Sequence, residues 1–110
     1  MNKYESVIII KPTLEKNERN EVMDKYQNIM KEYSGNDVKI EDLGMKKLAY
    51  QIQNQTHGYY VAFRFNAEPQ NILELERRFR IDENVMKFMT VKEEFYEYNE
   101  EQEEDDEEEY

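Results

Sequence analysis

The stretch YESVIIIK, residues 4–11, decides the fold, because it holds the longest purely aliphatic run of the sequence. It is short, rich in β-branched side chains and followed by Pro12, which together predict a β-strand. Alternation along a strand places Ile8 and Ile10 on one face of a sheet and Val7 and Ile9 on the other. This strand is therefore apolar on both of its faces.

The segment that follows predicts a helix and then a second strand. Apolar side chains recur at helical spacing from Val22 to Tyr33, and Ser34-Gly35 is a plausible helix end. Val38–Tyr50 alternates loosely between apolar and polar residues, which indicates a strand with a kink or bulge at Gly44. The polar sequence QNQTHG, which ends at Gly58, predicts the turn that follows.

The second half of the chain repeats a strand, a helix and a strand. Tyr59–Asn66 is dense in aromatic residues and predicts a third strand. Glu68-Pro69 predicts the start of a second helix, because proline is favoured at the first helical position. Val85–Lys92 predicts the fourth strand. The buried stripe expected for the second helix consists of Ile72, Leu75 and Phe79.

The order β-α-β-β-α-β, with right-handed crossovers, favours the split-βαβ or ferredoxin-like plait. This α+β fold is a four-stranded antiparallel sheet with two helices on one face and the first and third strands in the middle. Two helices cover only one face, so Val7 and Ile9 should point away from them and be exposed. Such a face is either the ordinary apolar surface of a small sheet or a surface for a partner.

Charge divides the chain into a near-neutral body and an acidic tail. Of the 26 acidic residues, 12 follow Lys92, whereas all 15 lysines and arginines lie within residues 1–92. The net charge of residues 1–92 is thus about +1, from 15 bases and 14 acids. We expect one domain over residues 1–93 and a disordered tail over 94–110, because EEQEEDDEEE has nothing to bury. The tail is either a solvating appendage or a functional segment that competes for basic partners or discourages nonspecific anion binding.

Enzyme chemistry finds little support in the composition. The sequence has no cysteine and a single histidine, His57, which excludes disulfides, thiolate metal sites and thiol catalysis. His57, expected in the turn, has no Ser or Asp at a recognised motif spacing, and no glycine-rich phosphate loop is present. We expect no catalytic residue, cofactor, metal or small-molecule substrate. The aliphatic runs are too short for a membrane span or a signal peptide, so we expect a soluble cytoplasmic protein.

Local clusters of basic side chains favour contact with nucleic acid. Each also has an ordinary role, since an edge lysine discourages aggregation and an arginine at a helix end offsets the helix dipole. The candidate phosphate-binding residues are Lys3, Lys46, Lys47, Arg80, Lys87 and Lys92.

Two other readings of the plait stay open at this point. The stretch HGYYVAFRF partly matches the signature of the RNA-recognition motif, but Tyr60 stands where a small residue belongs and Arg64 where an aromatic belongs. A reader of single-stranded RNA that stacks bases on Tyr60 is therefore one alternative. A ligand-sensing regulatory plait is the other, although such domains use glycine-rich loops and this chain has only three glycines.

The stretch LGMKKLAYQIQNQTHGYYVAFRF, residues 43–65, resembles the central signature of the bacterial small-subunit ribosomal protein six family. In that family a glycine and two basic residues precede Leu-Ala-Tyr, and a glycine-aromatic strand follows. YES at residues 4–6 and RRFRIDENVMKFMTVK at 77–92 extend the resemblance over about residues 1–93. The resemblance implies the plait fold and a structural protein of the small ribosomal subunit in the cytoplasm. It also implies binding to 16S-type rRNA in the central domain, or platform, together with ribosomal protein eighteen, a small basic chain.

The resemblance carries over to individual positions. Lys46-Lys47 matches the basic pair before Leu-Ala-Tyr, Arg80 the arginine before isoleucine, and Lys92 the lysine that closes the last strand. Gln51 departs from the family, in which proline often follows the tyrosine. The partner protein is expected on the open side of the sheet, where the candidate contacts are Val7, Ile9, Tyr50, Tyr60, Met89 and Val91.

Overall fold

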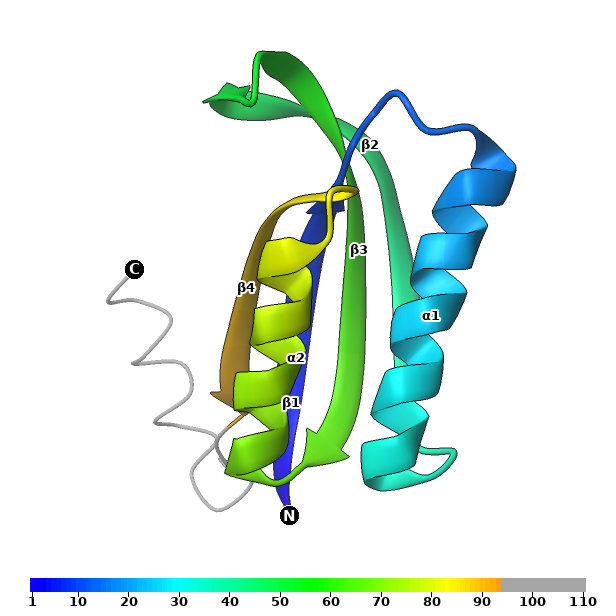
Figure 1. The fold of residues 1–110 in the computed structure, drawn as a ribbon, viewed down its shortest axis with the longest axis vertical. Helices are drawn as coiled ribbons and strands as arrows, with labels where there is room; N and C mark the ends of the chain where they lie inside the picture. The colour runs from blue at the N-terminus through cyan, green and yellow to red at the C-terminus, as the bar shows by residue number, and fades with distance from the viewer. Residues whose placement is uncertain (94–110) are drawn as a thin grey trace, which may run out of the picture.

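The computed structural model describes residues 1–93 and contains the predicted elements in the predicted order (Figure 1). The acidic tail predicted over residues 94–110 lies outside this range. The strands form one antiparallel sheet in the order β2-β3-β1-β4, and both helices cover the same face, so the ferredoxin-like plait is confirmed. The bounds of the elements are β1 Asn2–Ile10, α1 Lys16–Ser34, β2 Lys39–Ile52, β3 Gln55–Ala67, α2 Pro69–Ile81 and β4 Val85–Glu93.

The main core lies between the helices and the sheet. Ile8 and Ile10 of β1 are fully buried in it, as the alternation predicted. Opposite Ile8 on β3 lies Val61, which is also fully buried, and the helices contribute Tyr26 and Phe79, whose ring centroids are 4.8 Å apart. The main core therefore uses one of the two apolar faces of β1, the face that carries Ile8 and Ile10.

The end of α1 and the start of α2 lie where the sequence predicts, whereas α1 begins at Lys16, before the predicted apolar stripe that starts at Val22. α1 ends at Gly35, which has a φ of 71° and whose N–H donates a hydrogen bond to the Lys31 carbonyl at 2.7 Å. Glycine tolerates this left-handed conformation without steric cost. α2 begins at Pro69, and the Glu68 backbone N–H donates to the Asn71 side-chain oxygen at 2.9 Å.

The connection between β2 and β3 corrects one prediction. The chain turns at Gln53 and Asn54, whose φ angles are 51° and 64°, and Ile52 pairs directly with Gln55. Two successive positive φ angles are typical of the tight turn that joins antiparallel strands. The predicted turn over QNQTHG was therefore wrong in extent, and His57 lies in β3. The bulge predicted at Gly44 is confirmed by its φ of 84° and by the register shift there.

Residues 45–58 form a hairpin arm that pairs beyond the last β1–β3 partner, Ile10 with Tyr59 (Figure 1). Leu48 of this arm packs with Ile9 of β1 and Met86 of β4 in a second, small cluster on the side of the sheet away from the helices. Ile9 therefore points away from the helices, as predicted. The prediction that it is exposed was wrong, because only 8 % of its surface is exposed.

Candidate functional site

The open face, the side of the sheet opposite the helices, gathers the predicted partner-binding residues. Across the β1–β3 pair Ile9 lies opposite Tyr60, and across the β1–β4 pair Val7 lies opposite Met89. Val91 lies two residues beyond Met89 on β4 and shares its face. Tyr50 belongs to the hairpin arm. Strands β1, β3 and β4 and this arm, which are distant in sequence, thus supply one surface.

This surface is apolar and hollowed. A shallow hollow of about 190 Å³ is lined by Val7, Ile9, Tyr60, Lys87, Phe88 and Met89. Beside it, Met89 is 61 % exposed and Val91 46 % exposed. Exposed apolar side chains that adjoin one another are typical of contact surfaces. Ile9 forms the floor of the hollow and is covered by Leu48 and Met86, so it supports the surface more than it presents itself to a partner.

Two of the predicted phosphate-binding lysines flank the hollow. Lys87 Nζ donates a hydrogen bond to the Tyr50 hydroxyl at 2.6 Å and lies 5.1 Å from the centre of that ring. Lys46 Nζ lies 5.9 Å from the centre of the Tyr60 ring. Contacts between ammonium groups and aromatic faces at these distances are attractive and orient both partners. The apolar hollow of the open face is therefore flanked by two exposed cations.

The other four predicted basic residues are exposed but do not join this pair. Lys47 follows Lys46 on β2 and so points to the opposite side of the arm. Lys3 and Lys92 lie at the far end of the sheet, where Lys92 pairs with Tyr4. Arg80 lies in the last turn of α2. Of the six predicted basic residues, only Lys46 and Lys87 thus flank the hollow.

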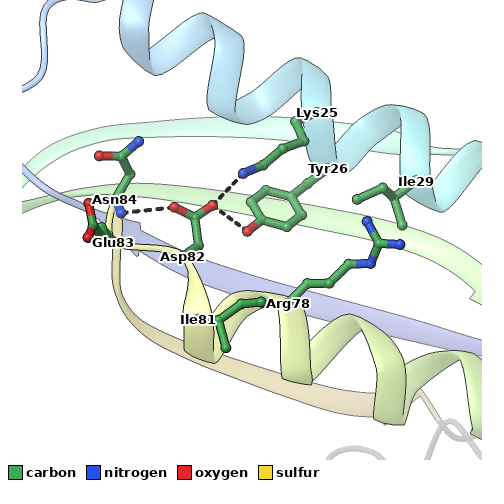
Figure 2. A pocket seen from close by; sticks show the side chains of 8 residues that line it. All are labelled: Lys25, Tyr26, Ile29, Arg78, Ile81, Asp82, Glu83 and Asn84. Atoms are coloured by element: carbon green, nitrogen blue, oxygen red, sulfur yellow. Dashed lines mark hydrogen bonds and ion pairs between the residues drawn. The ribbon is translucent and has the colours of Figure 1, made fainter.

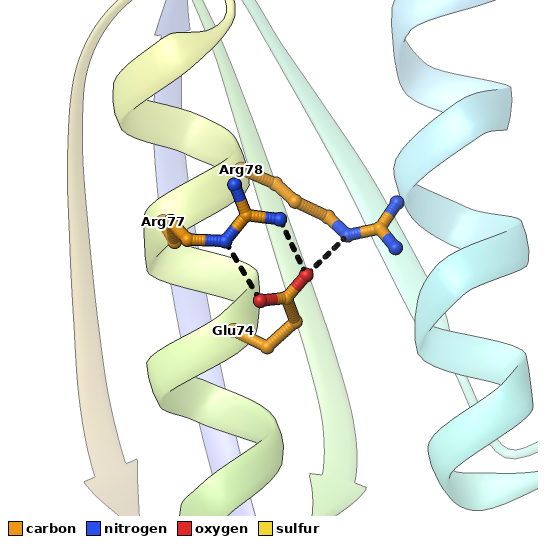
Figure 3. A network of polar contacts seen from close by, with 3 residues as sticks. All are labelled: Glu74, Arg77 and Arg78. Atoms are coloured by element: carbon orange, nitrogen blue, oxygen red, sulfur yellow. Dashed lines mark hydrogen bonds and ion pairs between the residues drawn. The ribbon is translucent and has the colours of Figure 1, made fainter.

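Two neighbouring arginines of α2, Arg77 and Arg78, form ion pairs with Glu74 of the same helix (Figure 3). Arg77 donates to both carboxylate oxygens of Glu74 at 2.8 and 2.7 Å, and Arg78 Nε donates to one of them at 3.2 Å. The hydrogen bonds from Arg77, followed by that from Arg78, lower the pKa of Glu74 to about 2 despite the opposing effect of desolvation. Glu74 therefore partly neutralises this basic cluster.

A groove between the helices was not predicted from the sequence (Figure 2). It has a volume of about 380 Å³, and Asp82 lies at its centre. The Asp82 carboxylate accepts hydrogen bonds from Lys25 Nζ at 2.7 Å, the Tyr26 hydroxyl at 2.5 Å and the Asn84 backbone N–H at 2.9 Å. Burial raises the pKa of Asp82, but these bonds outweigh it and hold the pKa below its ordinary value. Asp82 thus ties the end of α2 to α1.

The acidic and histidine side chains of the described residues do not cluster as metal ligands. Within residues 1–93 no three of His, Cys, Asp and Glu lie close enough to hold a metal ion. His57 is exposed on β3, where its Nδ1 lies 2.9 Å from the Thr56 hydroxyl. Neither helix in that range is long and apolar enough to cross a membrane.

Comparison with known proteins identifies the family. A sequence profile described as ribosomal protein S6 matches residues 3–92. The chain belongs to the ribosomal protein S6 family. The resemblance drawn from the sequence motifs is therefore confirmed.

Individual S6 proteins are similar over most of the chain. The small ribosomal subunit protein bS6 of Helicobacter acinonychis (strain Sheeba) is 40 % identical over 84 % of this chain, which spans only 65 % of that relative. The bS6 of Trichormus variabilis is 37 % identical, over 83 % of this chain and 84 % of the relative. The crystal structure of 30S ribosomal protein S6 from Thermotoga maritima superposes with a TM-score of 0.76 at 27 % identity, over 97 % of each chain.

Membership of the S6 family sets the cellular role. The protein is a component of the small ribosomal subunit and works in the cytoplasm as part of the ribosome. The S6 family is a family of structural ribosomal proteins and not of enzymes.

Proposed function

We propose that this S6 protein binds 16S-type rRNA in the platform of the small subunit together with ribosomal protein eighteen. The observation that carries the proposal is the open face, where Val7, Tyr60 and Met89 form an apolar hollow between Lys46 and Lys87. Apolar side chains of such a surface suit a protein partner, and the flanking lysines suit the phosphates of an adjacent RNA.

Binding to rRNA should depend on the partner protein. Residues 1–92 have a net charge of only about +1, and the whole chain has a formal charge of −11. Phosphate neutralisation supplies most of the sequence-independent affinity for RNA, so this protein alone should bind weakly. A small basic partner docked on the open face adds the missing positive charge.

The open face fits a base-stacking RNA reader less well. Such a sheet presents two or three exposed aromatic side chains to successive bases. On β3, Val61, Phe63 and Phe65 are buried against the helices, and Tyr60 is the one aromatic residue of that strand on the open face. Tyr60 is half-buried beside the Ile9 cluster, which leaves little of its ring for stacking.

Gel-shift titrations with a platform rRNA fragment test the proposal. We expect measurable specific binding for the pair of proteins and little for this protein alone. The double variant Lys46→Gln/Lys87→Gln should weaken binding of the pair by about tenfold at moderate salt. The control Lys16→Gln/Lys31→Gln removes the same charge from α1 and should change binding much less. Tight, salt-resistant binding by the unpartnered protein would refute the proposed order of assembly.

A further inference from the structure

The acidic residue at the end of the described range lies on the open face. Glu93, the last described residue, shares this face with Val91 and Met89 on β4. Its Oε1 lies 3.8 Å from Arg64 Nε, and the same nitrogen donates to Glu5 at 3.1 Å. The first acid of the run that ends the chain is therefore already paired with an open-face cation.

Positive charge exceeds negative charge on this face of the strands. Lys39 lies opposite Arg64 across the β2–β3 pair, close to Glu93, and Lys46 and Lys87 lie toward the hairpin arm. Strand alternation places five basic and three acidic side chains here. They are Lys3, Lys39, Lys46, Arg64 and Lys87, and Glu5, Glu41 and Glu93. Asp37, just before β2, adds a fourth acid at the end of the face near Glu93, where it accepts a hydrogen bond from Asn66 at 3.2 Å.

The segment beyond Glu93 matches this face in charge and in reach. Residues 94–110 contain 11 acidic residues among 17 and no basic one. An extended chain of that length spans up to about 55 Å. Along β4 the distance from Glu93 to Lys87 is only about 20 Å. Attachment at Glu93 also gives the segment an effective concentration in the millimolar range at the open face, on the order that short tethers provide.

We propose that residues 94–110 bind back on the open face as an intramolecular polyanion, through Lys39, Arg64, Lys46 and Lys87. The segment thereby occupies the cations that the proposed function gives to rRNA phosphates, and it discourages adventitious polyanions before assembly. The groove between the helices is a poorer site, because both of its cations, Lys25 and Arg78, are paired with Asp82 and Glu74. On the open face Arg64 is likewise paired with Glu5 and Glu93, but within residues 1–93 Lys39, Lys46 and Lys87 form no ion pair. The competition with rRNA rests on the proposed function, whereas the docking itself does not.

A spin label in the segment tests the docking without any RNA. The chain has no cysteine, so Gln102→Cys creates a single labelling site and leaves the charge unchanged. At low salt we expect NMR signals of the Lys39, Arg64, Lys46 and Lys87 amides to lose about half their intensity or more, as a tethered ligand at millimolar effective concentration would cause. The loss should disappear at about 0.5 M salt, where the Debye length is about 4 Å.

Charge variants provide the matched controls. Lys46→Gln/Lys87→Gln should relieve the broadening at the hairpin arm, whereas Lys16→Gln/Lys31→Gln, with the same loss of charge on α1, should not. Replacing the nine acids of residues 100–109 by their amides should tighten binding to heparin by about three- to tenfold at low salt.

Three results would overturn the proposal: broadening confined to the neighbours of Glu93, equal broadening on α1, or an unchanged affinity for heparin in the amide variant. None of these measurements uses rRNA. Their failure would leave rRNA binding by the protein pair intact, and a failure of the gel-shift titration would leave the docking intact.

Discussion

Gly58 is the residue that allows the hairpin arm to pack on the sheet. A Cβ atom at this position would lie 2.3 Å from Ile9 Cγ2, 3.3 Å from Met86 Cε and 3.4 Å from Leu48 Cδ2. Ile9 sits in a central strand and is β-branched, so its methyl group has little freedom to move away. Gly58→Ala should therefore destabilise the protein by about 1–3 kcal/mol through overpacking, as measured by urea unfolding.

A double-mutant cycle locates the clash. Ile9→Ala alone should cost about 2–4 kcal/mol, because it leaves a cavity in the small cluster with Leu48 and Met86. In the double variant the new methyl group at residue 58 occupies part of that cavity, so the combined cost should be smaller than the sum. Strictly additive costs would show that Gly58 and Ile9 do not interact.

The burial of Ile9 could not be predicted from the sequence of its own strand. Its face follows from alternation within YESVIIIK, because neighbouring side chains on a strand point in opposite directions. Its cover comes from Leu48 and Met86, which are distant in sequence, and from a glycine that lets the arm approach. Nothing in the strand itself encodes those contacts.

At the scale of elements, Asp82 joins the two helices. Its side chain is 8 % exposed and accepts hydrogen bonds from Lys25 and Tyr26 of α1, so removing its charge should loosen α2 from α1. Asp82→Asn should cost about 1.5–3 kcal/mol at pH 7, the range for hydrogen bonds to a charged group. Urea unfolding measures the loss, with the adjacent exposed Glu83→Gln as the charge-matched control.

The effect of Asp82 should depend on pH. Because its pKa is lowered in the folded protein, the charged carboxylate stabilises the fold above the unfolded pKa of about 3.9. That stability is lost as the pH falls through the lower folded pKa. The difference between wild type and Asp82→Asn should therefore shrink below about pH 3.9. A difference that stays constant down to pH 2 would contradict the assigned ion pair.

The elements themselves were largely legible in the sequence. The helical spacing of Val22, Tyr26 and Met30, the stop at Gly35 and the bulge at Gly44 all rest on local rules that the structure obeys. The β2–β3 turn was misplaced because QNQTHG is polar throughout, whereas a two-residue turn needs only Gln53 and Asn54. The polar residues after it are strand residues of the arm, in which only Leu48 and Gly58 are buried, so most of its positions do not select apolar side chains.

At the scale of the whole molecule, the order of elements predicted the plait, and the plait placed Val7, Tyr60 and Met89 on one face. The basic residues were predicted less well as a site. Lys46 and Lys87 flank the hollow, but Lys3, Lys92 and Arg80 lie elsewhere, because exposed side chains leave no periodic signal that relates one element to another. The groove between the helices was not predicted either, because it depends on contacts of Lys25 and Tyr26 with Asp82, which is distant from them in sequence.

The proposed function requires ribosomal protein eighteen to bind the open face. Calorimetric titration of that protein into two variants tests this requirement most directly. Met89 and Leu73 are 61 % and 71 % exposed, on the open face and on α2 respectively. Neither replacement by serine should change the free energy of unfolding by more than about 0.5 kcal/mol. Met89→Ser should weaken binding by about tenfold, or ~1.4 kcal/mol, and Leu73→Ser should leave it unchanged. Unchanged binding by Met89→Ser with weakened binding by Leu73→Ser would place the partner on the helices and contradict the proposed surface.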